Sequence, residues 1–107
     1  NKSHTASTID ASTQAQIHYE EKTANVVKAT LNLYYVHNGS YPIYAERVAE
    51  DTNIDLESRE LFKNSIEITL KEFDYSVKGD ESAYKFTYKS VTGETKEVEG
   101  DYENEYH

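Results

Sequence analysis

The chain contains no cysteine, no methionine and no tryptophan, and it has one proline and four glycines among its 107 residues. Without cysteine, a disulfide framework, a thiolate metal site and a thiol nucleophile are all excluded. No apolar run approaches the roughly 18 residues that a membrane-spanning helix needs. We therefore expect the printed residues to form a soluble domain without covalent cross-links.

Basic residues are scarce: 11 lysines and arginines stand against 20 aspartates and glutamates, which gives a net charge of −9. This balance argues against a nucleic-acid partner, since phosphates demand a positive protein surface. It disfavours an anionic membrane surface for the same reason. The length suits one domain, because most domains contain about 100 to 150 residues. We therefore treat residues 1–107 as a single domain.

The absence of methionine also bears on the start of the chain, which begins at Asn1. Because translation starts with methionine, we expect an upstream piece to be missing: a signal, a membrane anchor or an initiator methionine alone. Residues 1–12 are rich in serine and threonine, which favour helix caps over helix interiors. We predict that residues 1–12 are flexible or frayed.

A long helix is predicted over residues 13–38, where no glycine or proline interrupts the sequence. Two capping patterns precede it, Thr13 with Gln16 and Ser7 with Asp10, and the helix could begin near either. The sequence His-Asn-Gly at 37–39 is typical of a helix end. Apolar residues recur at intervals of three, four or seven and define one buried face. They are Ile17, Ala24, Val27, Leu31 and Tyr34.

Residues 39–65 form a variable connecting region, and residues 66–107 read as an antiparallel sheet. In the connecting region, the Tyr41-Pro42 pair predicts an extended step, and short helices are expected over 45–51 and 55–63. From Ile66 onward the apolar period changes to two, which is typical of strands with one buried face. Glycine-containing turns near 79 and 93 divide this region into three strands.

The alternation also predicts which residues face each other in the sheet. Between the first two strands we expect the pairs Val77 with Tyr84, Tyr75 with Phe86, and Phe73 with Tyr88. Between the second and third strands we expect Tyr88 opposite Val98, so that Phe86 covers Gly100. Lys85 and Lys89 would then lie between acidic neighbours.

These strands form a three-stranded antiparallel β-meander with an aromatic face. Only the long N-terminal helix is large enough to cover that face. The predicted fold class is therefore α+β, with one long helix packed on the meander and short helices in the connecting region.

Catalytic and cofactor-binding patterns are missing from the sequence. The four histidines, at positions 4, 18, 37 and 107, are scattered along the chain. His18 and Glu21 have the spacing of a helical metal pair, but two ligands leave a zinc site incomplete, and a solvated helix face is the simpler interpretation. No phosphate-binding loop or nucleophile elbow is present. We therefore predict a protein that is not an enzyme, with no catalytic or cofactor-binding residues.

An unusual row of acidic residues lies along one face of the predicted third strand, where these residues alternate with Val98, Gly100, Tyr102 and Tyr106. A row of like charges on one strand face could bind a cation, because calcium accepts several oxygen ligands. The alternative is a charged edge strand that resists pairing with other chains, and we favour it because no calcium-binding loop is present. The row consists of Glu97, Glu99, Asp101, Glu103 and Glu105, and the candidate calcium ligands are Asp80, Glu81, Glu99 and Asp101.

The stretch ANVVKATLNLYYVHNGSYP, residues 24–42, resembles the type IV pilin and type II secretion pseudopilin family. In that family the second half of a long N-terminal helix ends in a tyrosine-bearing turn, followed by Asn/Asp-Gly and then Tyr-Pro. The overall order of helix, variable region and C-terminal antiparallel sheet extends the resemblance to nearly the whole chain. The matching residues are Leu31, Leu33, Tyr34, Tyr35, Asn38, Gly39, Tyr41 and Pro42.

The resemblance implies a soluble domain that lacks the hydrophobic half of its N-terminal helix. It further implies a structural subunit of a bacterial type IV pilus or type II secretion pseudopilus, assembled into a helical filament with copies of itself and related pilins. The missing helix would anchor it in the bacterial inner membrane, with this domain in the periplasm or, after assembly, outside the cell. Charged positions on the helix would contact neighbouring subunits, namely Glu20, Glu21, Lys22 and Lys28. Calcium near the C-terminal sheet also has a precedent in that family.

The chain departs from the family pattern in two respects, because it has no cysteine pair and no Gln-Gly-Leu run after Tyr41-Pro42. Pilus and pseudopilus therefore both remain open. One alternative is a membrane-anchored ligand-binding or adhesive head that uses tyrosine-rich loops around Tyr41, Tyr44 and Tyr84, since tyrosine offers large contact area at low entropy cost. The other is a small hydrolase that uses acidic residues.

Overall fold

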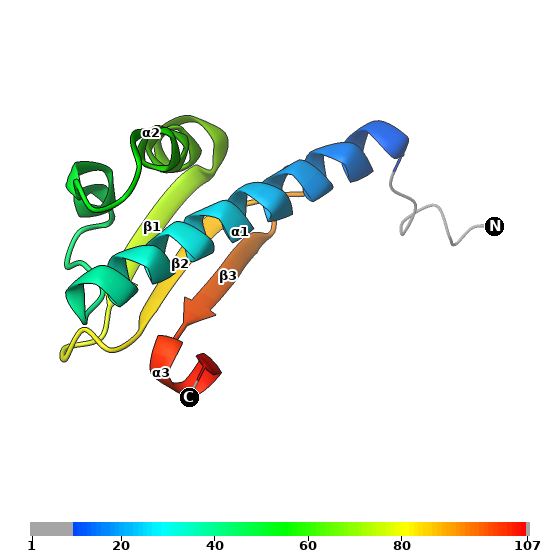
Figure 1. Ribbon diagram of the computed structural model, residues 1–107. Coiled ribbons are helices and arrows are strands. Elements are labelled where there is room, and N and C mark those ends of the chain that lie inside the picture. The colour runs from blue at the N-terminus through cyan, green and yellow to red at the C-terminus, as the bar shows by residue number, and fades with distance from the viewer. Residues whose placement is uncertain (1–9, 107) are drawn as a thin grey trace.

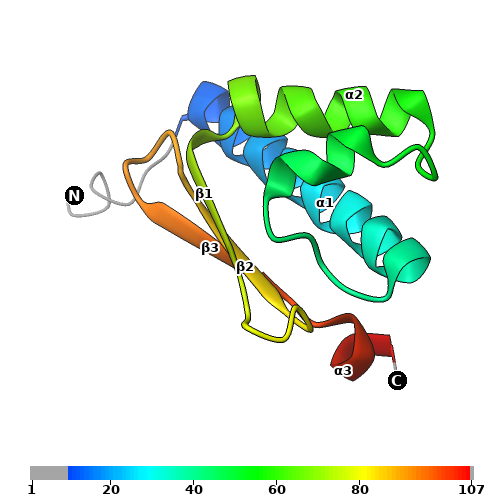
Figure 2. The ribbon, with the colours of Figure 1, turned by 90° about the vertical axis from the view of Figure 1, so that its left-hand side faces the viewer.

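The computed structural model describes residues 10–106. A long helix, α1 (Ala11–Asn38), leads into a short 3₁₀ helix, η2 (Ala45–Glu50), then α2 (Leu56–Asn64) and a π-helical turn, η3 (Ser65–Thr69). Three antiparallel strands follow in the order β1-β2-β3, and a short helix, α3, ends the chain. The strands are β1 (Lys71–Val77), β2 (Tyr84–Lys89) and β3 (Thr95–Gly100), and α3 is Tyr102–Tyr106. Helix α1 crosses one face of the sheet, and α2 lies beside α1, so the fold is α+β as predicted (Figures 1 and 2).

Helix α1 begins and ends at residues that satisfy its free backbone groups. The carboxylate of Asp10 accepts a hydrogen bond from the Thr13 N–H at 2.7 Å, so Asp10 is the N-cap. Gly39 has a φ of 78° and donates its N–H to the carbonyl of Tyr35, which closes the helix. The predicted end is therefore confirmed. The predicted start at residue 13 is wrong by two residues, because Ala11 and Ser12 are already helical; Ser7 lies outside the described residues.

The buried stripe of α1 largely matches the predicted face. Ala24, Val27 and Leu31 are buried, whereas Ile17 and Tyr34 are only half-buried. Tyr35, which the spacing did not select, is also buried. These side chains pack with the aromatic face of β2, and burying a large apolar side chain contributes about 1.5–3 kcal/mol. The buried aromatic residues of β2 are Tyr84, Phe86 and Tyr88.

The connecting region supplies a second part of the core. Val48 in η2, Ile54 and Phe62 in α2 are almost fully buried. Asp55 is the N-cap of α2, and its carboxylate accepts a hydrogen bond from the Ser58 N–H at 2.9 Å. The short helices predicted for this region are thus present, shifted by a single residue.

The segment after α2 is helical where a strand was predicted. Ile66 and Leu70 alternate with polar residues, which suggested a strand from residue 66. However, Phe62, Ile66 and Leu70 are all buried, and their spacing of four fits a helix face. The Leu70 N–H donates to the carbonyl of Ser65 at 2.9 Å and ends a π turn. The continuing helix therefore determines the structure, and β1 begins only at Lys71.

The first two strands pair in the predicted register for part of their length. Val77 faces Tyr84 and Tyr75 faces Phe86, as expected. The predicted pairing of Phe73 with Tyr88 is wrong, because the ladder is irregular between Lys71 and Asp74 and Glu72 adopts a φ of 52°. The Phe73 ring packs instead on Phe86, with ring centroids 5.3 Å apart.

The register between β2 and β3 differs from the prediction by two residues. Phe86 faces Val98, and Tyr84 faces Gly100. The turn determines this register, because the Ser90 N–H donates to the carbonyl of Glu94 at 2.8 Å. An aromatic ring does cover Gly100, as proposed, but it is the ring of Tyr84 rather than Phe86. A Cβ atom added at Gly100 would overlap that ring.

The predicted continuation of the third strand is wrong. Strand β3 ends at Gly100, and Asp101 accepts a hydrogen bond from the Asn104 N–H at 3.2 Å where α3 begins. The rings of Tyr102 and Tyr106, four residues apart, pack at 4.7 Å on this helix. Only Glu97 and Glu99 of the five acidic residues therefore lie on the strand.

The predicted surroundings of the two β2 lysines are correct for one of them. Lys85 faces Glu99 and lies 3.9 Å from the carboxylate of Glu97. Lys89 lies between Lys71 on β1 and Thr95 on β3, so it does not have acidic cross-strand neighbours.

Candidate functional site

The end of α1 is tied to the segment that follows it. The amide of Asn38 donates one hydrogen bond to the carbonyl of Tyr34 and another to the carboxylate of Asp51, each at 2.9 Å. Gly39 provides the left-handed turn at which the chain reverses. The pKa of Asp51 is lowered although burial alone would raise it, because Asn53 and Asn38 donate hydrogen bonds to its carboxylate. The Asn-Gly pair therefore fixes the direction in which the connecting region leaves the helix.

Tyr41 connects three parts of the fold. Its side chain is fully buried, and its backbone N–H donates to the carbonyl of Glu81 in the β1–β2 turn at 2.9 Å. Its hydroxyl donates to the side-chain oxygen of Asn32 at 2.9 Å and accepts from the Tyr102 N–H at 3.0 Å. Burial raises the pKa of Tyr41, so the hydroxyl stays protonated and keeps both roles.

Two further tyrosines complete this junction. The hydroxyl of Tyr35 donates to the carboxylate of Glu103 at 3.0 Å, and that of Tyr75 donates to the carbonyl of Pro42 at 2.7 Å. Burial raises the pKa of Tyr75 as well. The sequence-predicted motif residues therefore come together in one place, where they join α1, the connecting region, the sheet and α3. They are Tyr35, Asn38, Gly39, Tyr41 and Pro42.

The four candidate calcium ligands do not form a metal site. Asp80 accepts hydrogen bonds from the hydroxyl and the N–H of Ser82, which lower its pKa. Asp101 caps α3, and Glu81 lies in the β1–β2 turn with a φ of 61°. Across residues 10–106, no group of three or more acidic or histidine side chains is arranged to hold a metal ion.

The described histidines lie on the exposed surface of α1. His18 and His37 are exposed on α1, as is Glu21, while His4 and His107 lie outside the described residues.

Tyr41 and Tyr84 are buried, so the binding surface predicted around them is wrong in this respect. Tyr84 is packed so tightly that, among the residues the structure describes, its hydroxyl has no hydrogen-bond partner. Of the three tyrosines predicted for that surface, Tyr44 alone is exposed, with 62% of its surface accessible.

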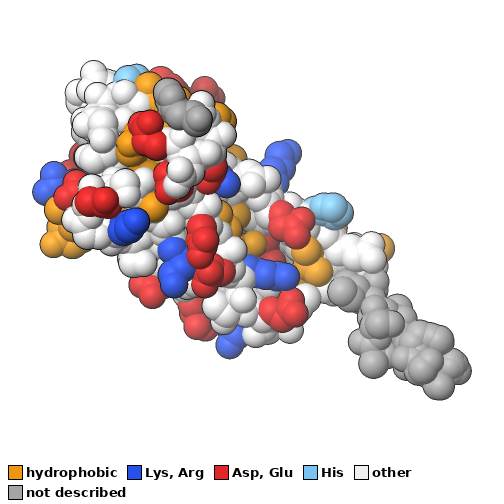
Figure 3. Space-filling model, turned by 90° about the horizontal axis from the view of Figure 1, so that it is seen from below, with side chains coloured by type: hydrophobic (Ala, Val, Ile, Leu, Met, Phe, Trp, Pro, Cys, Tyr) orange, Lys and Arg blue, Asp and Glu red, His pale blue; other side chains and the backbone are white. Residues whose placement is uncertain are grey.

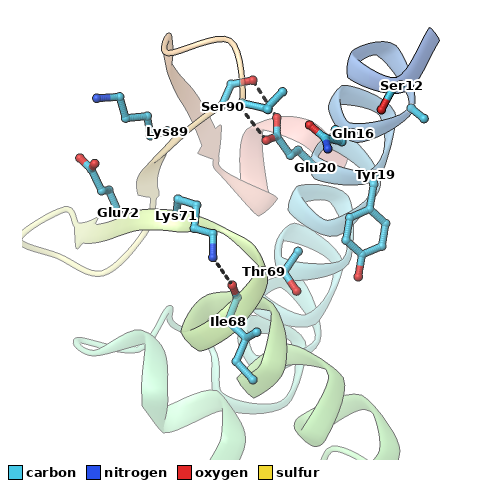
Figure 4. Close-up of a pocket in the computed structure, with 12 residues that line it drawn as sticks. Ser12, Gln16, Tyr19, Glu20, Ile68, Thr69, Lys71, Glu72, Lys89 and Ser90 are labelled. Carbon is cyan, nitrogen blue, oxygen red and sulfur yellow. Dashed lines mark hydrogen bonds between the residues drawn. The ribbon is translucent and has the colours of Figure 1, made fainter.

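A groove of about 1000 Å³ lies beside the first turns of α1 (Figure 4). One wall is α1 itself, where Gln16 and Glu20 point toward the turn after β2 and Tyr19 also lines the groove. The other walls are the η3–β1 junction and the turn after β2. Three large apolar side chains in the groove are exposed, and they are Tyr19 (60%), Ile68 (63%) and Val91 (48%). Sequence reasoning missed this groove, because its walls come from segments that are distant along the chain.

Glu20 holds the groove in shape. Its two carboxylate oxygens accept hydrogen bonds from the hydroxyl of Ser90 at 2.7 Å and from the Val91 N–H at 2.8 Å (Figure 4). These bonds fix the β2–β3 turn against α1. Glu20 therefore binds its own chain, although it was expected to contact a neighbouring subunit, and Lys28 likewise lies 3.6 Å from the carboxylate of Glu105. Glu21 and Lys22 are exposed.

A second exposed apolar surface follows the end of α1. Ile43 and Tyr44 are 53% and 62% exposed, although the two preceding residues, Tyr41 and Pro42, are buried. By contrast, the face shown in Figure 3 carries acidic and basic side chains interspersed over most of its area. Other large apolar side chains of the described residues are exposed as well, among them Val36, Leu56 and Leu61, so apolar contact with another molecule is not confined to these two places.

Comparison of the chain with protein-family models, with curated protein sequences and with solved structures found no match. Within residues 10–106, no helix combines the length and the apolar character needed to cross a membrane.

Proposed function

We propose that this chain is the head domain of a structural, non-enzymatic subunit of a bacterial type IV pilus or type II secretion pseudopilus. In this proposal an apolar helical segment precedes the printed residues and anchors the subunit in the inner membrane. Copies of the subunit, together with related pilins, assemble head to tail into a helical filament. Such an association does not close into a ring and so generates a fibre.

The observation that carries the proposal is the position of α1 relative to the rest of the fold. At about 1.5 Å per residue, its 28 residues span about 42 Å. The buried residues of α1 lie between Thr23 and Tyr35, so its first twelve residues contribute no buried side chain. In Figure 1 this N-terminal part projects beyond the sheet. A helix that extends past its own domain is suited to continue into a longer rod.

The junction at the end of α1 supports the same proposal. The motif that resembles the pilin family coincides with the residues that join α1 to the sheet and to α3. Tyr41 connects the helix and the C-terminal segment through its hydroxyl, and the β1–β2 turn through its backbone N–H. A filament subunit needs such a connection, because the helix carries the load between subunits while the sheet lies outside it.

The first test of this proposal is to read the coding sequence upstream of Asn1 and to fractionate the bacterial cell. We expect about 20 apolar residues directly before α1, preceded by a short basic leader, and we expect the full-length protein in the inner-membrane fraction before assembly. An unrelated soluble domain upstream, or a full-length protein found only in the soluble fraction, would overturn the proposal.

The groove favours one second candidate, a membrane-anchored ligand-binding or adhesive head. A groove of about 1000 Å³ with exposed apolar walls has the size of a small-molecule site. This candidate predicts that the protein binds its ligand as a single subunit and forms no filament.

A further inference from the structure

The chain contains one Asn-Gly pair, Asn38-Gly39, and the pair lies where α1 ends. In such a pair the backbone nitrogen of the glycine can attack the side-chain amide of the asparagine, because glycine has no side chain to hinder the approach. Asn38 and Gly39 are both exposed, so water reaches them. The pair therefore has the chemistry of a deamidation site.

We propose that Asn38 is the site at which this chain deamidates, that the end of α1 holds the reaction back in the folded protein, and that the product releases the connecting region from the helix. The inference goes beyond the proposed function and does not depend on it, since it concerns a covalent change within one subunit.

The reaction needs no reactant other than water. The Gly39 nitrogen gives up its proton to solvent and forms a bond to the side-chain carbonyl carbon of Asn38. The bond from that carbon to the amide nitrogen breaks, and the nitrogen takes up a proton from water and leaves as ammonia. Water then opens the resulting five-membered succinimide at either of its two carbonyls, which gives aspartate or isoaspartate. One water is consumed and one ammonia is released, so neither an oxidant nor a reductant is required.

The nucleophile of this reaction is held in the folded protein. The Gly39 N–H donates to the carbonyl of Tyr35 at 2.7 Å, and Gly39 has a φ of 78°. A backbone N–H in a hydrogen bond loses its proton to solvent only when the structure around it opens, as amide hydrogen exchange shows. The last turn of α1 must therefore open before the Gly39 nitrogen can attack.

The leaving group is held as well. Both hydrogens of the Asn38 amide are used, one toward the carbonyl of Tyr34 and one toward the carboxylate of Asp51, each at 2.9 Å. Because the amide nitrogen has to leave as ammonia, both of these bonds must break during the reaction. The native contacts of Asn38 therefore oppose its deamidation.

The product cannot replace these contacts. Aspartate has no amide hydrogen to donate to the Tyr34 carbonyl or to the Asp51 carboxylate, and it brings a negative charge to the end of α1 at which the helix dipole is also negative. Arg47, Glu50 and Asp51 line the same small hollow as Asn38, so the new charge would be the third carboxylate beside one guanidinium. Isoaspartate in addition lengthens the backbone by one carbon. Deamidation therefore removes the tie between α1 and the connecting region.

The first experiment compares the rates of deamidation in the folded and the unfolded chain. The purified 107-residue chain is incubated at mildly alkaline pH, either in buffer or in guanidinium chloride, and peptide mapping by mass spectrometry separates asparagine, aspartate and isoaspartate. In the unfolded chain Asn38 should deamidate before any other asparagine. In the folded chain it should react at least tenfold more slowly than in the unfolded chain. Equal rates in the two states, or another asparagine reacting first in guanidinium chloride, would overturn the inference.

The variant Asp51→Ala tests the anchor of the leaving group. It keeps the Asn38-Gly39 pair but removes one acceptor, so deamidation of the folded variant should be at least threefold faster than in the wild type. The matched control is Glu50→Ala, which removes an exposed neighbouring carboxylate of the same hollow and should leave the rate unchanged. Circular dichroism confirms that both variants are folded at the temperature used. A rate for Asp51→Ala equal to or below that of Glu50→Ala would contradict the anchoring role.

Hydrogen exchange of the Gly39 amide in the wild type gives a measurement that does not depend on the folding of a variant. Since the same opening of α1 frees the proton and the nucleophile, the deamidation rate of the folded chain should rise with temperature in proportion to this exchange rate. Deamidation that does not follow the Gly39 exchange rate would refute the gating by α1.

The variant Asn38→Asp tests the consequence of the reaction. It reproduces the aspartate product and should lower the melting temperature by about 4 °C or more. The matched control is Asn64→Asp, the same change at the exposed last residue of α2, and it should lower the melting temperature by less than half as much. Equal shifts would show that the product does not release the connecting region.

Discussion

The Tyr41 hydroxyl accepts a hydrogen bond from the backbone N–H of Tyr102, which lies 61 residues further along the chain, at 3.0 Å. The same hydroxyl donates to the side chain of Asn32 on α1. One buried group thus satisfies a helix side chain and the first residue of α3. Removing the Tyr41 hydroxyl should therefore lower the stability more than removing the hydroxyl of an exposed tyrosine.

Tyr41→Phe should destabilise the protein by about 1–3 kcal/mol, because it removes a buried hydroxyl that donates to the half-buried Asn32 side chain and accepts from the Tyr102 N–H. Urea denaturation measures the free energy of unfolding. The matched control is Tyr44→Phe, which removes the same hydroxyl from a side chain that is 62% exposed and should change stability by less than about 0.5 kcal/mol. Equal effects of the two substitutions would contradict the role assigned to Tyr41.

Gly100→Ala should destabilise the protein by about 1–3 kcal/mol, because the added methyl group overlaps the Tyr84 ring and forces the core to shift. Gly79→Ala is the control, since a Cβ atom there meets nothing within 4 Å. It should be neutral or slightly stabilising, because alanine restricts the unfolded chain more than glycine does. Thermal melting of both variants checks the prediction, which fails if Gly100→Ala melts at the wild-type temperature.

The strand register and the long helix show which parts of the fold could be predicted from the sequence. The Tyr84–Gly100 pair was not predicted, because the alternation of residues fixes which face a side chain occupies but not how far one strand slides past the next. The β2–β3 turn determines that shift. A shift of two residues keeps every side chain on the same face, so the alternation is identical in the predicted and the observed register. The long helix, by contrast, was predicted nearly to its ends, since its apolar period and its glycine cap are local features.

Other errors came from short segments in which two periods compete. Ile66 and Leu70 fit a strand through their alternation and a helix through their spacing from Phe62, and tertiary burial selected the helix. Tyr102 and Tyr106 were similarly ambiguous. The groove could not be predicted at all, because Tyr19, Ile68 and Val91 meet only after folding. The one signal was that Tyr19 lies off the predicted apolar face of the long helix.

Glu20→Ala should loosen the β2–β3 turn without unfolding the domain. The Val91 N–H loses its acceptor, so its amide hydrogen should exchange with solvent at least tenfold faster, and the groove should lose one fixed wall. Glu21→Ala removes the adjacent, exposed carboxylate and should leave the exchange rate unchanged. Hydrogen exchange followed by NMR measures the exchange rate of the Val91 amide in both variants. Unchanged protection of Val91 in Glu20→Ala would show that Glu20 does not hold the turn.

Stability should fall in acid partly through the helix cap of α2. The pKa of Asp55 lies below its ordinary value of 3.8, because Ser58 donates hydrogen bonds to the carboxylate through its N–H and its hydroxyl. A lowered pKa in the folded state contributes stability that is present above pH 3.8 and is lost as the pH falls through the folded value. Asp55→Ser keeps a capping oxygen but does not titrate. Urea denaturation between pH 6 and pH 2 should therefore show a smaller acid loss for this variant; equal losses would refute the assignment.

The filament function is tested most directly by immunogold electron microscopy of the bacterium, with antibodies raised against the 107-residue chain. The account predicts filaments labelled along their whole length, absent when the gene is deleted and restored when it is supplied again. Gold confined to the membrane or the cell interior, with no labelled filament under conditions that express the protein, would contradict it.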